Sequence, residues 1–169
     1  MIRALIFALW TAVAAAQSPE QLNFSSLAAK ARESTELTLD ASTLALAGKQ
    51  MTGDEAKVKG LLAGLKGIVI RSYEFEREGA YTHAEVEQIR RVFQTPGWKR
   101  VVAISSKADS ENYEVFSKLE SGKTTAMALL TTEPKEVTLV YMDGAVDLGQ
   151  LSELGARFGA SGSIKKGTK

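Results

Sequence analysis

Apolar residues recur along this chain with two periods, and each period predicts a different element. A spacing of three and four residues is typical of a helix with one buried face, whereas alternation is typical of a strand. The helical spacing occurs near residues 24–31, 44–51, 54–65, 82–93 and 147–158, and Thr82-His83-Ala84-Glu85 matches the capping box that starts a helix. Alternating or continuous apolar runs predict strands over residues 36–40, 68–77, 99–106, 112–119, 124–132 and 136–142.

The order of these elements favours an α+β fold. The predicted strands between residues 99 and 142 follow one another through short polar loops, and loops of that length join antiparallel strands. A doubly wound nucleotide-binding fold alternates strands with helices, so this order excludes it. We therefore predict a two-layer α+β fold, with a largely antiparallel sheet and the helices packed on one face.

The amino-terminal residues have the pattern of a secretory signal peptide. Arg3 precedes the apolar run Ala4–Val13, whose length of about 10 residues is half of what a membrane-spanning helix needs. Small residues follow this run, and we predict cleavage between Ala16 and Gln17. The mature chain is then expected to be periplasmic or secreted. It has no second apolar run of spanning length, so we expect no transmembrane anchor in it.

The sequence predicts three segments. Residues 1–16 form the signal peptide, residues 17–158 form a single α+β domain, and residues 159–169 form a flexible polar, basic tail. No repeat or interior linker divides the middle segment, and no pattern specifies an oligomeric state.

Charge and cysteine content exclude several functions. The chain has 169 residues, with 21 Lys and Arg against 20 Asp and Glu. A phosphate backbone binds clustered cations, so this balance predicts no nucleic-acid partner. The chain has no cysteine, which excludes disulfides, thiolate nucleophiles and cysteine-bound zinc. Gly122-Lys123-Thr124 copies the end of a phosphate-binding loop, but Ser117 stands where that loop needs glycine, so we expect no nucleotide or other cofactor.

Candidate acid–base residues are few. His83 is the only histidine and lies in the first turn of a predicted helix, with Glu87 one turn later. This position is typical of a surface residue. Glu74, Glu76 and Glu78 alternate along a predicted strand and its end, where they either face solvent or attract a hard cation such as calcium. Glu74 and Glu76 are also the candidates for carboxylate-dependent hydrolysis. Catalytic residues therefore stay unassigned, and no metal site is expected.

Four aromatic residues form a second group of candidates: Tyr73, Phe75, Tyr81 and Trp98. Aromatic side chains fill cores, and they are also enriched at contact hot spots. In the second interpretation they form a candidate interaction surface together with Glu74 and Glu76. A strand edge offers another route to a partner, through addition of an extended segment.

Several short motifs occur together along the mature chain, namely Leu65–Phe75, Glu78–Tyr81, Pro96–Trp98, Glu133–Thr138, Asp143–Gly144, Asp147–Leu151 and Gly155–Gly159. As a set they resemble the bacterial domain of unknown function 4252 family. The resemblance implies an exported protein. Family members are often lipoproteins, whereas this chain lacks the lipid-bearing cysteine. The resemblance implies no established activity or catalytic residue set, and an association of the family with extracytoplasmic-function sigma and anti-sigma factor genes implies envelope signalling or stress.

We therefore predict an exported, non-enzymatic periplasmic module. It would bind a protein or another envelope component through a strand edge or an exposed aromatic patch. Two alternatives stay open. One is a carboxylate-dependent hydrolase, which would use residues such as Glu74 and Glu76. The other is a structural or folding accessory of the envelope.

Overall fold

The computed structural model describes residues 24–50 and 56–146, which form six strands and four helices. In chain order these are α1 (Ser25–Ala28), β1 (Glu33–Asp40), α2 (Ala41–Gln50), α3 (Ala56–Ala63), β2 (Leu65–Glu74), α4 (His83–Val92), β3 (Trp98–Ser106), β4 (Glu111–Glu120), β5 (Lys123–Glu133) and β6 (Glu136–Gly144). The predicted signal peptide, the helix predicted over residues 147–158 and the predicted tail lie outside the described residues.

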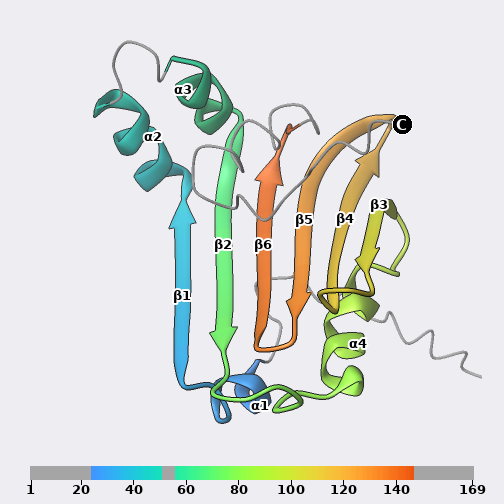
Figure 1. Ribbon diagram of the computed structural model, residues 1–169. Helices are drawn as coiled ribbons and strands as arrows, with labels where there is room; N and C mark the ends of the chain where they lie inside the picture. Colours follow the sequence, from blue (N-terminus) through green and yellow to red (C-terminus); the bar gives the residue numbers. More distant parts are fainter. Residues whose placement is uncertain (1–23, 51–55, 147–169) are drawn as a thin grey trace, which may run out of the picture.

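The strands form one antiparallel sheet in the order β1-β2-β6-β5-β4-β3 (Figure 1). β3, β4, β5 and β6 follow one another as a meander, as the predicted hairpins require. β1 and β2 form a second antiparallel pair, and the pairing of β2 with β6 makes one sheet of both parts. The predicted α+β fold with a largely antiparallel sheet is therefore confirmed.

The turn between β4 and β5 contains the sequence that copies part of a phosphate-binding loop. Ser121 and Gly122 have φ angles of 51° and 78°. Two successive residues with positive φ are typical of the type I′ turn of a hairpin. The next residue, Lys123, is already the first residue of β5. The segment is thus a hairpin, and it lacks the strand-to-helix turn on which phosphate binding depends.

Neighbouring strand residues belong to two different apolar clusters. Ala128 and Tyr141 lie in a cluster with residues of α1 and α4, such as Leu27 and Ile89. Met127 and Met142 lie in a second cluster with Leu44 of α2 and Leu62 of α3. Successive strand residues point to opposite faces of a sheet, so the two clusters lie on opposite faces. We call the face that carries Ala128 and Tyr141 the α4 face.

The packing of all helices on one face is not confirmed, because helical residues contribute to both clusters. In Figure 1, α2 and α3 lie near one end of β1 and β2, whereas α1 and α4 lie near the other end of the sheet. Apolar spacing within a helix indicates that one side is buried, but it does not indicate which face of the sheet buries it.

The start of α4 follows the predicted capping box. Thr82 Oγ1 accepts a hydrogen bond from the Glu85 amide at 3.3 Å, and Glu85 Oε2 accepts one from the Thr82 amide at 2.8 Å. Lys30 Nζ lies 2.8 Å from Glu85 Oε1, which ties α4 to the residues after α1. The hydrogen bond from Lys30 is the main cause that lowers the pKa of Glu85 to about 2, although burial opposes it.

Two predicted boundaries are wrong around β2. Leu65 continues the helical spacing of α3 in the sequence, but it begins β2 and is buried. β2 also ends at Glu74, so Glu76 lies in a loop and does not share a strand face with Glu74. The reason for the early end is the partner strand, since β6 begins at Glu136, opposite Glu74.

Gly144 ends β6 at a close approach between two backbones. Its φ is 134°, and a Cβ atom there would lie 2.4 Å from the Gly64 carbonyl oxygen. We expect Gly144→Ala to lower the free energy of unfolding by roughly 2–4 kcal/mol, because the side chain meets backbone that cannot rotate away. Urea denaturation followed by circular dichroism measures this. Gly60→Ala is the matched control, since nothing lies within 4 Å of a Cβ atom at that helical glycine. It should be neutral or stabilising by up to about 1 kcal/mol, and equal losses for both variants would contradict the close approach.

Glu85 should make the stability of the fold depend on acid pH. Its folded pKa of about 2 lies below the ordinary value of 4.5, so its ionised form stabilises the fold above pH 4.5 and this contribution is lost as the pH falls toward 2. Glu85→Gln keeps a capping side chain but removes the charge. We expect it to reduce the unfolding free energy at pH 7 by about 1 kcal/mol and to leave it unchanged near pH 2. Denaturant titrations at both pH values test this, with the exposed loop variant Glu78→Gln as the control.

Candidate functional site

The candidate aromatic residues belong to the core and do not form an exposed patch. Tyr73 and Phe75 are 0% and 1% exposed. Tyr81 and Trp98 are partly buried against the same cluster. The Tyr73 hydroxyl donates a hydrogen bond to Glu36 Oε1 at 2.6 Å, which holds β1 against the sheet. The core-filling interpretation therefore describes this group.

The candidate acidic residues do not converge on a site. Glu74 forms an ion pair with Arg32, and its strand partner is Glu136. Glu76 is exposed in the following loop. Within residues 24–50 and 56–146, no group of three or more Asp, Glu or His side chains could hold a metal ion. His83 is a surface residue of α4, with a side chain that is 82% exposed and Nε2 at 3.4 Å from Glu87 Oε1.

An open cavity of about 360 Å³ lies between α4 and the outer strands β3 and β4. We call it the edge groove. Its lining residues are Glu87, Arg90 and Gln94 from α4 and the turn after it, Arg100, Ala103, Ile104 and Ser105 from β3, and Asn112 and Glu114 from β4. Sequence reasoning singled out none of these as a site except Glu87, as the neighbour of His83.

Helical spacing directs one side of α4 to the edge groove. Val86 and Ile89 are buried and fix the adjacent side of the helix on the core. Glu87, Arg90 and Gln94 follow at intervals of three and four residues, so their side chains share one side of the helix. Because the buried side of α4 fixes the rotation of the helix about its axis, it also determines which polar side chains of α4 face β3.

A β-bulge in β3 directs two of its residues to the edge groove. Arg100 pairs with Phe116 and Ala103 pairs with Glu114, with a register shift between Arg100 and Val102. Residues three apart in a regular strand point to opposite faces. The extra residue of the bulge instead places Arg100 and Ala103 on the same face, the α4 face, where Phe116 also lies.

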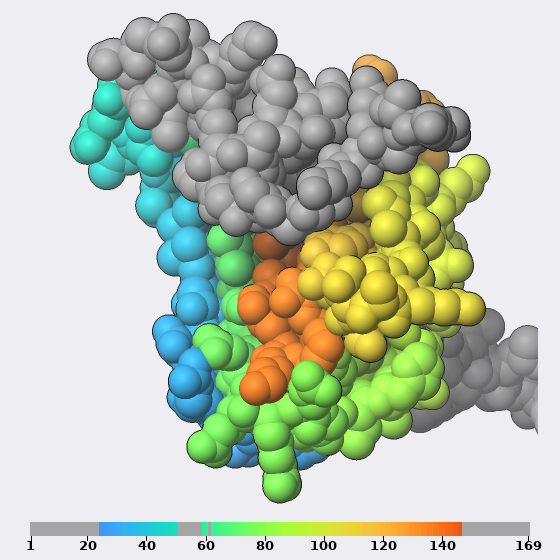
Figure 2. All heavy atoms as spheres, viewed as in Figure 1, coloured from blue at the N-terminus to red at the C-terminus, as the bar shows by residue number. Residues whose placement is uncertain are grey.

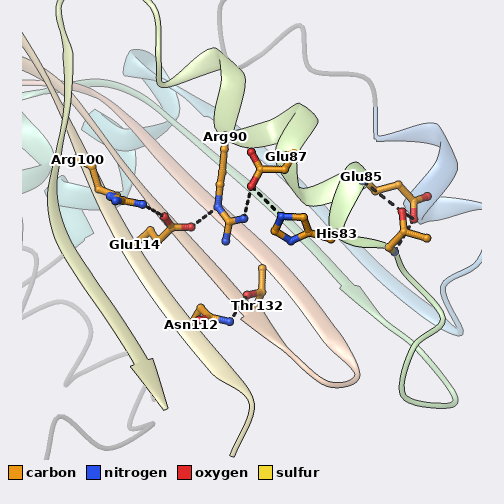
Figure 3. Close-up of polar contacts among 9 residues, drawn as sticks. His83, Glu85, Glu87, Arg90, Arg100, Asn112, Glu114 and Thr132 are labelled. Carbon is orange, nitrogen blue, oxygen red and sulfur yellow. Dashed lines mark hydrogen bonds and ion pairs between the residues drawn. The ribbon is translucent and has the colours of Figure 1, made fainter. Parts of the chain in front are cut away.

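A charge network centred on Glu114 lies in the edge groove (Figure 3). Glu114 itself is 5% exposed. Arg90 Nε lies 2.5 Å from Glu114 Oε2, and Arg100 Nη1 lies 2.8 Å from Glu114 Oε1. Arg90 Nη1 also lies 2.6 Å from Glu87 Oε1. A buried carboxylate needs paired and hydrogen-bonded partners, and the two arginines supply them from two elements.

These contacts favour the charged forms of Arg90 and Glu87. Burial disfavours the charged form of Arg90, but its hydrogen bonds to Glu87 and Glu114 outweigh burial and raise its pKa. The hydrogen bond from Arg90 is likewise the main cause that lowers the pKa of Glu87. The contact between Arg90 and Glu87 thus favours the charged form of both groups.

The edge groove lies beside β3, which is one of the two outermost strands among the described residues. β1 and β3 are the outermost strands, and the blue atoms of β1 and the yellow atoms of β3 and β4 border opposite sides of the face in Figure 2. Val101 and Ile104 of β3 are 43% and 46% exposed, although both are apolar. On β1, Leu37 is 40% exposed. Two exposed apolar residues and the groove therefore occur together at the β3 edge.

The chain belongs to the family described as "Domain of unknown function (DUF4252)". The family match covers residues 28–154. Among proteins with curated descriptions, none matches the chain. The chain is similar to the solved structure titled "Structure of crystal form III of TP0453", with 11% identity over 79% of this chain and 55% of that chain and a TM-score of 0.23. The chain thus spans about half the length of that protein, and a TM-score of this size establishes no shared fold.

Helices of the described residues are also too short or too polar to cross a membrane.

Arg90 and Arg100 should differ in their effect on stability. The Arg90 side chain is 15% exposed, and that of Arg100 is 56% exposed. We expect Arg90→Ala to lower the free energy of unfolding by about 3 kcal/mol, because it removes a partner from the buried Glu114. Arg100→Ala should cost less than about 1 kcal/mol, because the Arg100 side chain is mostly exposed and Arg90 still pairs with the buried Glu114. Urea denaturation at pH 7 measures both, and Arg90→Met separates lost packing from lost charge. Equal effects of the two alanine variants would contradict the structural role of Arg90.

Proposed function

We propose that this protein is an exported, non-enzymatic binding module that accepts an extended segment of an envelope protein along β3. The observation that carries the proposal is the position of the edge groove, which lies directly beside a free strand edge. A role in envelope signalling or stress is consistent with this proposal.

The exposure of β3 supports strand addition. Six of its nine residues are exposed. The outer side of an edge strand presents backbone N–H and C=O groups without a strand partner, and an added strand can satisfy them. The bulge interrupts the edge at one point, but Val102–Ser106 continue in regular register with β4.

The edge groove gives such an addition a source of specificity. Every second side chain of an added strand points to the same face as the groove. Main-chain hydrogen bonds then supply affinity, while the groove discriminates among side chains.

β1 is the less suitable edge. Its residues are also exposed, but it contributes no residue to the edge groove, and Leu37 is its one strongly exposed large apolar side chain among the described residues. The hydrolase alternative gains no support from the described residues, because Glu74 is ion-paired with Arg32 and Glu76 is exposed in a loop.

Site-specific photocrosslinking tests the binding edge. A photoreactive residue replaces Val101, Leu37 or Leu46 in the full chain, which is expressed in its native host. Leu46 lies on α2 and is 57% exposed, so it controls for random collision. We expect Val101 to capture a defined extended segment of an envelope protein, and Leu46 to capture none. Capture through Leu37 alone, or no capture above the Leu46 level, would overturn the proposed use of β3.

Export rests on the amino-terminal sequence pattern. We expect the chain isolated from its host to begin at Gln17, because cleavage follows Ala16. Intact-mass spectrometry measures this amino terminus. Replacing Leu5 and Leu9 in the apolar run by Asp should leave the full-length chain in the cytoplasm, whereas Thr11→Ser should not.

A further inference from the structure

We infer that the segment bound along β3 presents an aspartate or glutamate side chain to Arg100, an inference that rests on the proposed strand addition. Arg100 lies on the α4 face of β3, beside the edge groove and next to the free edge. An added strand would place alternate side chains on this same face.

The hydrogen bonding of Arg100 supports an anionic ligand. A guanidinium group has five N–H donors in a planar fork that fits a carboxylate. Within the described part of the chain, Arg100 donates one hydrogen bond, which Glu114 accepts. Since the Arg100 side chain is 56% exposed, its other donors are accessible to a carboxylate from outside.

The distribution of charge in the groove also favours an anion. The carboxylate of Glu114 is buried, with a side chain that is 6% exposed, whereas Arg100 lies at the exposed end of the network. An approaching segment therefore meets the positive group first. The formal charges of Glu87 and Glu114 balance those of Arg90 and Arg100, so the preference for an anion follows from the exposed position of Arg100 and not from a net charge of the groove.

The same contacts argue against a cationic ligand. Both oxygens of Glu114 already accept hydrogen bonds from arginines, and Glu87 Oε1 accepts one from Arg90. A cation that binds Glu114 would have to displace an arginine from this buried carboxylate, and the charge-assisted hydrogen bond of that arginine would be lost.

The short side chains of β3 define the neighbouring position of the segment. Ala103 and Ser105 follow Arg100 along the groove and leave it open. We therefore expect the acidic residue of the segment to lie opposite Arg100. The next side chain on that face would lie over Ala103 and Ser105.

The test begins with the segment that the Val101 crosslink captures. A synthetic peptide with that sequence, and a second peptide with its acidic residue changed to the amide, are titrated into the full mature chain by fluorescence anisotropy. We expect Arg100→Ala to weaken binding of the acidic peptide roughly tenfold or more, and Arg100→Lys to weaken it less. The amide peptide should bind the Arg100→Ala variant as tightly as it binds the unaltered chain.

Lys99→Ala is the matched control. Lys99 is also an exposed cation of β3, but it pairs with Ser117, which lies one residue from Phe116 and hence on the other face. Its loss should change binding less than about threefold. If Val101 captures no segment, the proposed strand addition fails. If it captures a segment without an acidic residue, or if Arg100→Ala acts no more strongly than Lys99→Ala, strand addition stands and the carboxylate inference is overturned.

Discussion

The pairing of β2 with β6 is the constraint on which the rest of the structure depends. It joins the amino-terminal strand pair to the carboxy-terminal meander, from Glu74 opposite Glu136 to the end of β6 at Gly144. The pairing closes a long loop, which runs from β2 through α4 and the other strands to β6. This closure costs conformational entropy, and the burial of apolar side chains must offset it. Both faces of the pair contribute buried apolar side chains. On the α4 face, Val69 lies opposite Tyr141 in one cluster. On the other face, Ile68 lies opposite Met142 in the second cluster. The two apolar clusters therefore extend across this pair, and the cluster on which α4 packs includes residues of both β2 and β6.

The edge groove arises from two departures from regular, apolar packing. One is the bulge, which places Arg100 and Ala103 on the same face of β3. The other is the charged residue Glu114, which lies among the buried residues of β4. A buried carboxylate is weak support for stability in itself, because its desolvation offsets much of the attraction to its partners. Its effect here is to hold the side chains of a helix and of an edge strand at one place.

The sequence predicted most elements but not the site. Alternation located the meander, and the capping box located α4, because both patterns are local. Leu65 was misplaced because its helical spacing from Leu61 and Leu62 continues into a strand whose partner, β6, is distant in the sequence. The edge groove was missed because it depends on which strand is outermost and on a bulge, and both follow from pairing between strands. The signal for the groove that the sequence offers is Glu114. It is a single acidic residue between Tyr113 and Val115, on a strand whose centre is buried.

The contacts of Arg90 have a consequence for the kinetics of binding. Arg90 joins α4 to β4 through an ion pair within the chain, so this contact of the groove is formed without a bound segment. On association, nearly all of the loss of conformational entropy would then occur in the incoming segment, because only its backbone passes from many conformations to one. Added salt would slow the approach of the segment to the exposed Arg100 far more than it would loosen the shielded contact between Arg90 and Glu114.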